Sequence, residues 1–183
     1  FSLKQYDSRE VANHIINMDA EIGIVGTAME KNKCIFEPFA DDQLVVVTPN
    51  SEKFRALGGD FPLDLLKKEP FILREYGSGT RKETEDSLTQ MGVDPKALHV
   101  IAQMDSTESI KQAVAKGLGT TITSRNAAED YVRSGMLLAF DLKSEYLKRK
   151  FYFVYHKDRP LSPAAEAFMK FAKEYFSEHP ERA

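Results

Sequence analysis

Two spacings of apolar residues alternate along the chain, and they predict helices and strands in turn. Asp7 and Glu10 have the spacing of a capping box ahead of apolar residues at helical spacing, which predicts a helix over residues 8–18. Further helices are predicted at five places: over residues 63–68, from the glycine-rich turn at 77–80 to Gly92, from Asp105 or Ser106 to Gly117, from Ser124 through Val132, and from Ser162 onward.

The last of these helices has the plainest signals. Ser162 is the expected N-cap and Pro163 the first helical residue. Four residues after it recur at helical spacing and are expected to form one core face: Phe168, Phe171, Ala172 and Tyr175.

Short apolar runs of strand length separate the predicted helices. They span residues 21–27, 35–39, 43–49, 71–75, 99–104, 120–123, 136–140 and 150–157. Pro38 and Pro49 are expected to end the second and third runs. Because the runs are continuously apolar, we expect strands that are buried on both faces. Strands that alternate with helices predict an α/β fold with largely parallel sheets.

The composition limits the class of protein. The 183 residues include 25 Lys and Arg against 28 Asp and Glu, and the net charge of −3 disfavours unaided nucleic-acid binding. With 42% hydrophobic residues, the chain can bury the core of one domain or of two small lobes. The single cysteine, Cys34, cannot form an intramolecular disulfide, and no apolar run reaches the ~20 residues that span a bilayer. Since residues 1–10 also lack the features of a signal peptide, we expect a cytoplasmic protein or one whose start is missing.

The first candidate binding segment is a glycine-rich turn between a predicted strand and a predicted helix. Gly77 and Gly79 allow a sharp turn, and the hydroxyls of Ser78 and Thr80 join the N–H groups of the helix start as donors to an anion. The alternative is that these residues only turn the chain and cap the helix. The spacing is neither that of a P-loop nor that of a dinucleotide-binding motif, so nucleotide binding is not expected.

A second hydroxyl-bearing turn also joins a predicted strand to a predicted helix. Ser106 and Thr107 lie at the end of the strand over 99–104, and ligands of α/β proteins bind at the carboxyl ends of strands. The alternative here is an ordinary capping box of Asp105 with Glu108. Thr27, at the end of the first predicted strand, is a third candidate of the same kind.

The remaining reactive side chains do not form a catalytic constellation. The histidines are scattered, and His14, on a helix stripe beside core positions, is expected to be a packed residue. Cys34 is expected to be a small buried hydrophobe, and Ser78 lacks the G-x-S-x-G pattern of hydrolases. The sequence therefore predicts neither an enzyme nor a metal or cofactor site. The basic stretch over 143–150 is expected to be a solvated loop or edge.

Four segments, taken together, resemble the effector-binding domain of LysR-type transcriptional regulators. They are EIGIVG at 21–26, LREYGSGTR at 73–81, DSTESIKQAVAKGLGTTITS at 105–124 and FYFVYHKDRPLSPAAEAFMKFAKEYF at 151–176. They fall in the family's order and cover most of the chain. The glycine-serine-glycine-threonine form is similar to the branch that includes regulators of sulfur assimilation and carbon fixation.

The resemblance implies two Rossmann-like lobes joined by crossing strands, as in type 2 periplasmic binding proteins. Lobe I takes residues 1–43 plus 148–183, and lobe II takes 44–147. A small anionic effector, a carboxylate or an inorganic oxyanion, is expected in the cleft between the lobes. The resemblance places six residues there: Thr27, Ser78, Gly79, Thr80, Ser106 and Thr107. Arg81 is expected to brace the turn or pair with a carboxylate instead.

The resemblance also implies partners and exposes a departure. Members of the family act as dimers or tetramers and bind DNA through a winged helix-turn-helix, which the segments found here do not include. The first strand and helix of lobe I are also missing, so an exposed sheet edge and an apolar face are expected to favour association with another copy. The rival interpretation is the solute-binding protein of an anion ABC transporter, which has the same fold and a similar anion site.

Overall fold

The backbone of the computed structural model, which describes residues 2–29, 32–142 and 145–179, groups into two compact units. Unit 1 takes the described residues up to Asp42, the turn Gly77–Gly79, and the described residues from Arg149 onward. Unit 2 takes Gln43–Tyr76 and Thr80–Lys148. The chain therefore leaves unit 1 within strand β2 (Cys34–Pro49) and returns to it at the start of strand β7 (Lys148–His156).

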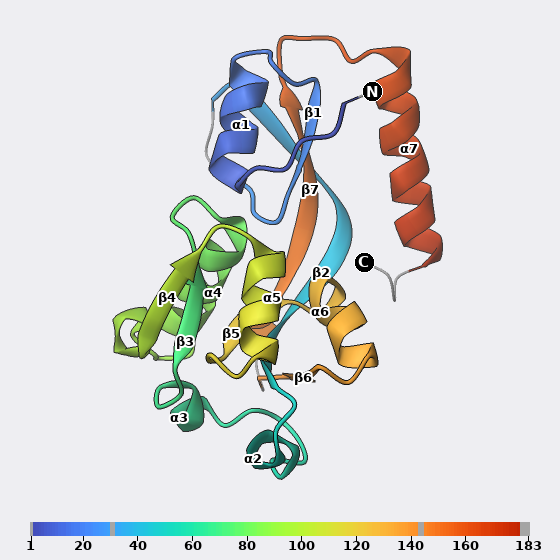
Figure 1. Cartoon of the computed structure of the whole chain (residues 1–183). Helices are drawn as coiled ribbons and strands as arrows, with labels where there is room; N and C mark the ends of the chain where they lie inside the picture. The colour runs from blue at the N-terminus through green and yellow to red at the C-terminus, as the bar shows by residue number, and fades with distance from the viewer. Residues whose placement is uncertain (1, 30–31, 143–144, 180–183) are drawn as a thin grey trace. The chain divides into compact units, whose positions relative to one another are not determined.

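Unit 1 is a small sheet with a helix on each face. Strand β1 (Ile22–Val25) is antiparallel to β7, with Ile22 opposite Tyr155, and β7 lies next to β2. Helices α1 (Ser8–Ile16) and α7 (Pro163–Glu178) lie on opposite sides of these strands (Figure 1). Side chains of a strand alternate between its faces, so Val154 packs with Ile15 of α1 while Phe153 packs with Met169 of α7.

The predicted N-terminal ends of both helices are confirmed, but α1 ends at Ile16, short of the predicted residue 18, and the predicted core face of α7 is partly wrong. Asp7 accepts a hydrogen bond from the Glu10 N–H at 2.8 Å, and Ser162 accepts one from the Ala165 N–H at 3.2 Å. Phe168 and Phe171 are 47% and 64% exposed. The buried stripe lies along Ala165, Met169 and Ala172, because small and flexible side chains let the helix approach the aromatic residues of the sheet closely.

Phe168 and Phe171, which lie outside the buried stripe of α7, border an apolar groove on unit 1. The groove has a volume of about 410 Å³, and its lining comes from α7 and from all three strands of the unit. The lining residues are Ile24, Phe39, Phe151, Phe168, Phe171, Ala172, Tyr175 and Phe176.

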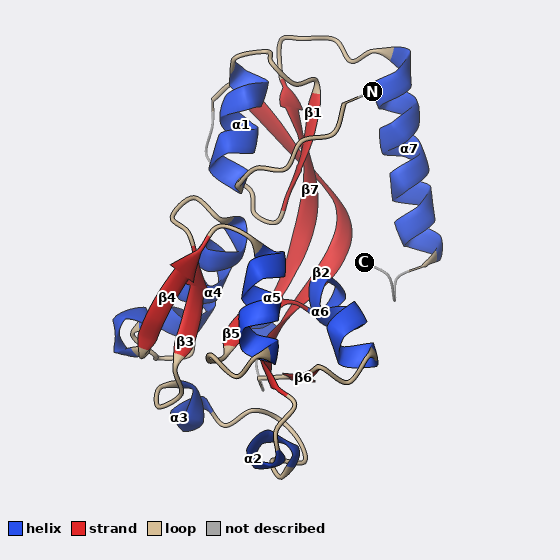
Figure 2. Ribbon diagram, in the orientation of Figure 1, coloured by secondary structure: helices blue, strands red, loops and turns tan. Residues whose placement is uncertain are grey.

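Unit 2 alternates short strands with helices along the sequence (Figure 2). After β2 come α2 (Glu52–Arg55), α3 (Leu63–Leu66), β3 (Phe71–Arg74), α4 (Gly79–Gln90), η1 (Pro95–Ala97), β4 (Val100–Met104), α5 (Thr107–Ala115), β5 (Thr121–Ser124), α6 (Arg125–Arg133), β6 (Leu137–Phe140) and η2 (Glu145–Leu147). Helix α4 begins at Gly79, a residue that groups with unit 1, and continues in unit 2 from Thr80.

The α/β fold class is confirmed, but the expectation of largely parallel sheets is wrong for the described strands. Strands β3 and β4 are parallel, whereas β5 and β6 are both antiparallel to β2, which lies between them. Strands β5 and β6 still point the same way, as a strand-helix-strand unit requires. The alternation of strands and helices fixed their direction relative to each other, but it did not reveal that a third, opposite strand lies between them.

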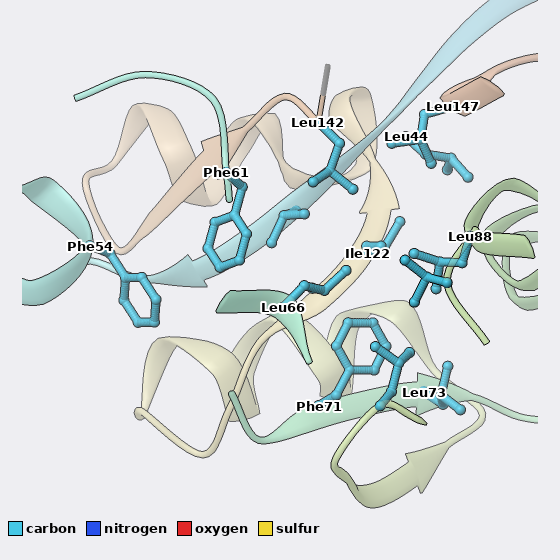
Figure 3. Packing of buried hydrophobic residues seen from close by; sticks show 13 residues of the cluster. Leu44, Phe54, Phe61, Leu66, Phe71, Leu73, Leu88, Ile122, Leu142 and Leu147 are labelled. Atoms are coloured by element: carbon cyan, nitrogen blue, oxygen red, sulfur yellow. The ribbon is translucent and has the colours of Figure 1, made fainter. Parts of the chain in front are cut away.

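The apolar run of β2 is buried on both faces, as its continuous pattern predicts. Leu44 and Val46 face a large cluster that includes Phe71, and these side chains converge from strands and helices of unit 2 (Figure 3). Val45 and Val47 face a second cluster around Val114 and Leu137. Each helix layer of unit 2 therefore packs against one side of the same strand.

One predicted strand boundary is wrong, because Pro38 does not end a strand and β2 runs through it as one element. The pairings of β2 with β5 and β6 begin only at Leu44 and Val46. Pro38 thus lies on a part of β2 that precedes both pairings, where neither β5 nor β6 requires the N–H that proline lacks.

Candidate functional site

The parallel strands β3 and β4 of unit 2 end side by side, and polar side chains follow both of them. Arg74 is the last residue of β3 and pairs in register with Met104, the last residue of β4. The Arg74 guanidinium reaches across to the turn after β4, where Nη1 donates to Thr107 Oγ1 at 2.7 Å and Nη2 donates to the Asp105 carbonyl at 3.3 Å. The carboxyl ends of parallel strands are where α/β proteins gather ligand-binding groups.

Ser106 and Thr107 begin helix α5, as expected for that turn. Ser106 is the N-cap and its Oγ accepts from the Ser109 N–H at 3.3 Å. The alternative capping box of Asp105 with Glu108 is wrong, because the Glu108 carboxylate accepts from the Tyr131 hydroxyl at 2.6 Å and pairs with Lys111. These bonds, that from Tyr131 first, lower the pKa of Glu108 below its ordinary value.

The glycine-rich turn leads into α4 as predicted. Gly77 has φ +110°, a left-handed conformation that strains residues with a side chain. Ser78 is buried, and Thr80 is half-buried in the first turn of α4. Arg81 braces the turn as expected, since Nε donates to Glu85 at 2.8 Å and Nη1 donates to the Arg74 carbonyl at 3.1 Å.

In unit 1, the structure brings Thr27 beside the glycine-rich turn. A Cβ atom placed on Gly79 would lie 2.9 Å from Thr27 Cγ2 and 2.7 Å from Ser8 Oγ, closer than real Cβ contacts. Glycine is therefore the residue that lets the backbone at 79 approach Thr27 this closely. Thr27 itself is buried.

A cation lies directly beneath the Gly26–Thr27 turn of unit 1. A Cβ atom on Gly26 would lie 2.7 Å from Arg149 Nη1, so glycine also leaves room for this guanidinium. Arg149 Nε donates to Asp42 at 2.7 Å, and the two side chains are only 5% and 0% exposed. The expectation that residues 143–150 form a solvated basic stretch is therefore wrong for Arg149; residues 143 and 144 lie outside the described part.

The six predicted site residues thus fall into two groups. Thr27, Ser78 and Gly79 belong to unit 1, whereas Thr80, Ser106 and Thr107 belong to unit 2. Two arginines lie beside these residues but were not among the predicted site residues: Arg74 bonds to Thr107, and Arg149 lies next to Gly26. Arg74 had a signal, because it is the cation that closes an apolar strand just before the glycine-rich turn; Arg149 lay inside a run of charges and had none.

The reactive side chains without a predicted role have structural partners. His14 Nδ1 lies 3.2 Å from Asp19, and its ring stacks at 4.5 Å from Tyr6. Cys34 packs in the α1 cluster of unit 1. Over residues 2–29, 32–142 and 145–179, no group of three or more His, Cys, Asp or Glu residues could hold a metal ion, and no helix there is long and apolar enough to cross a membrane.

Comparison with known proteins gives the family. The sequence model of the LysR substrate binding domain matches residues 1–177. A RuBisCO operon transcriptional regulator of Acidithiobacillus ferrooxidans is 36% identical over 151 residues, which are 82% of this chain and 48% of that protein. The uncharacterized HTH-type transcriptional regulator YeiE of Escherichia coli K12 is 32% identical over 166 residues, or 90% of this chain and 55% of YeiE. The chain thus spans about half the length of these relatives.

Solved structures agree with the sequence match. The regulatory domain of CcmR from Synechocystis PCC6803, in complex with 2-PG, has a TM-score of 0.83 and 27% identity, and the match covers 95% of this chain and 82% of CcmR's. The effector binding domain of QuiR in complex with shikimate has a TM-score of 0.84 at 18% identity, over 98% of this chain and 82% of QuiR's, and shows the same fold. The named relatives are transcriptional regulators, which agrees with the expectation that the chain is not an enzyme. The chain belongs to the LysR substrate-binding domain family.

Proposed function

We propose that this chain is the effector-sensing regulatory domain of a LysR-type DNA-binding transcription factor that acts in the cytoplasm. The observation that carries the proposal is the family match over residues 1–177. In this proposal DNA is bound by a helix-turn-helix elsewhere in the full-length protein. Sequencing the coding DNA upstream of Phe1 tests this directly: a helix-turn-helix supports the regulator, and a signal peptide overturns it.

The effector, in our proposal, is a small anion held by hydroxyl and backbone donors of both units. Thr27, Ser78 and Gly79 contribute from unit 1, and Thr80, Ser106 and Thr107 contribute from unit 2. The support is chemical, since hydroxyls at the starts of helices favour a carboxylate or an oxyanion. The 2-PG bound to the CcmR regulatory domain makes that compound the natural first probe.

Regulation follows if the effector binds one arrangement of the two units better than another. A ligand shifts a conformational equilibrium only by its difference in affinity for the two states. A ligand contacted by residues of both units differs in affinity for the two arrangements, because only one of them allows all of its contacts at once. The shift is then transmitted through a dimer or tetramer to the DNA-binding domains, which light scattering of the full-length protein with and without effector can examine.

Alanine variants of two hydroxyl residues test the proposed contacts. Ser78→Ala and Thr80→Ala should each weaken binding of 2-PG roughly tenfold, because a hydrogen bond to a charged group contributes on the order of 1.5–3 kcal/mol. Isothermal titration calorimetry on the 183-residue chain measures this. Thr89→Ala, an exposed position at the other end of α4, is the matched control and should bind as the wild type does. Unchanged affinity in the Ser78 and Thr80 variants would remove those residues from the site.

A further inference from the structure

Arg74 and Glu75 of unit 2 are adjacent in the sequence and form an ion pair. The pair lies beside Thr107, one of the predicted binding residues. Arg74 Nε donates to one carboxylate oxygen of Glu75 at 2.8 Å, and Arg74 Nη2 donates to the other oxygen, also at 2.8 Å. This is the two-pronged geometry in which a guanidinium recognises a carboxylate or a phosphate. The side chains are only 15% and 18% exposed, so the pair is largely shielded from water.

The same guanidinium is fixed from its other side by the turn after β4. Its bonds to Thr107 Oγ1 and to the Asp105 carbonyl hold the plane of the fork at the carboxyl end of β3. Since Thr107 Oγ1 accepts the bond from Arg74, the hydroxyl hydrogen is left to point elsewhere and can donate to an anion. The Arg74 guanidinium therefore keeps two partners at the turn between β4 and α5 besides Glu75.

The Glu75 carboxylate occupies the two N–H donors with which the Arg74 guanidinium could bind an anionic ligand. Any carboxylate or phosphate ligand that binds at Thr107 comes close to the Arg74 guanidinium. Such a ligand either tolerates the negative charge of Glu75 beside it or displaces that charge. Two anions cannot take the same two N–H donors, and like charges in a poorly hydrated place repel strongly.

We propose that Arg74 is a specificity-determining residue of the effector site and that Glu75 is a built-in competitor for it. The effector's anionic group, with two oxygens on one carbon or phosphorus atom, displaces Glu75 and accepts the two parallel N–H bonds of Arg74 together with the Thr107 hydroxyl. This inference rests on the proposed function. It adds that the effector is selected for a bidentate anion and that its affinity is reduced by an internal rival.

Removal of the competitor should strengthen binding, which a bracing role of Glu75 would not do. Calorimetric titration of the 183-residue chain with 2-PG, and separately with inorganic phosphate, compares the wild type with Glu75→Gln and Arg74→Lys. Glu75→Gln should bind roughly tenfold more tightly, and Arg74→Lys roughly tenfold more weakly, because lysine cannot form the fork. In ¹H–¹⁵N spectra the Arg74 Nε–H resonance, identified by its loss in Arg74→Lys, should shift on titration with 2-PG.

Charge-matched controls come from exposed ion pairs of the same unit. Glu145→Gln breaks the pair with Lys148, and Arg125→Lys alters the pair with Asp141; both should bind as the wild type does. Thermal unfolding by circular dichroism checks that every variant is folded.

The outcomes separate the two proposals. If the wild type binds a probe and Ser78→Ala weakens it, but Glu75→Gln and Arg74→Lys bind as their controls do, the role of the pair is overturned and the effector site stands. Weaker binding by Glu75→Gln overturns the competitor in the same way. If neither the wild type nor Glu75→Gln binds either probe, the anion site itself falls, and the role of the pair with it.

Discussion

Two arginine–carboxylate pairs, one in each unit, show how differently the same chemistry can be used. Asp42 and Arg149 are separated by 107 residues in sequence, join β2 to β7 and are almost wholly excluded from water. Arg74 and Glu75 are adjacent in sequence and keep some exposure. Both pairs have short charge-assisted hydrogen bonds, yet their surroundings give them different consequences.

The difference lies in what remains when one partner leaves. At Asp42–Arg149, loss of either group leaves a charge in a place without water, and this is strongly unfavourable. At Arg74–Glu75, loss of the carboxylate leaves a guanidinium that still donates to Thr107 and to the Asp105 carbonyl, with solvent close by. The folded state therefore needs both partners of the buried pair. At the partly exposed pair, a ligand can take the place of the carboxylate, because the guanidinium has other partners.

The largest expected effect is on the buried pair. Asp42→Asn should lower the free energy of unfolding by about 3–5 kcal/mol, because Arg149 stays charged and buried without its carboxylate. Urea denaturation followed by circular dichroism measures the loss. Asp41→Asn, which breaks the exposed neighbouring pair with Lys150, is the control and should change much less. Equal losses in the two variants would mean that burial does not distinguish these pairs.

A smaller effect on stability is expected at the exchangeable pair. Glu75→Gln should cost about 1 kcal/mol, because Arg74 keeps its bonds to the β4 turn and the new amide can still accept a hydrogen bond. The same urea experiment applies, with Glu145→Gln as the charge-matched control. A loss as large as that of Asp42→Asn would identify Glu75 as a structural residue and weaken the case for exchange.

The smallest effect concerns a carboxylate held by neutral donors. The Ser162 N–H and hydroxyl both donate to Glu21, and these bonds, the backbone one first, hold the pKa of Glu21 below its ordinary value of 4.5. A depressed pKa stabilises the fold above the unfolded pKa, and this contribution is lost as the pH falls. The wild type should therefore exceed Glu21→Gln in stability at pH 7, and the gap should close below about pH 4.5. A gap that stays constant in urea titrations at both pH values would show that the charge of Glu21 contributes nothing.

The sequence predicted the local structure well because local rules act over a few residues. The N-caps Ser106, Ser124 and Ser162 all cap the helices that their patterns indicate. Arg81, which was expected to brace the turn or pair with a carboxylate, pairs with Glu85 only four residues further along the same helix. The predicted site residues Ser106 and Thr107 lie where their turn was expected, since a strand end and a helix start are both visible in the pattern.

The order of helices and strands, their caps, the α/β class and the resemblance to LysR effector-binding domains all follow from the amino-acid sequence. The directions of the strands, the buried stripe of α7, and the contacts of Arg149 with Asp42 and of Arg74 with Thr107 become visible only in the folded chain. The reason is the range of the interactions. A cap or an amphipathic stripe is complete within a few neighbouring residues, whereas strand direction and the partner of a buried charge depend on residues 30 to more than 100 positions away.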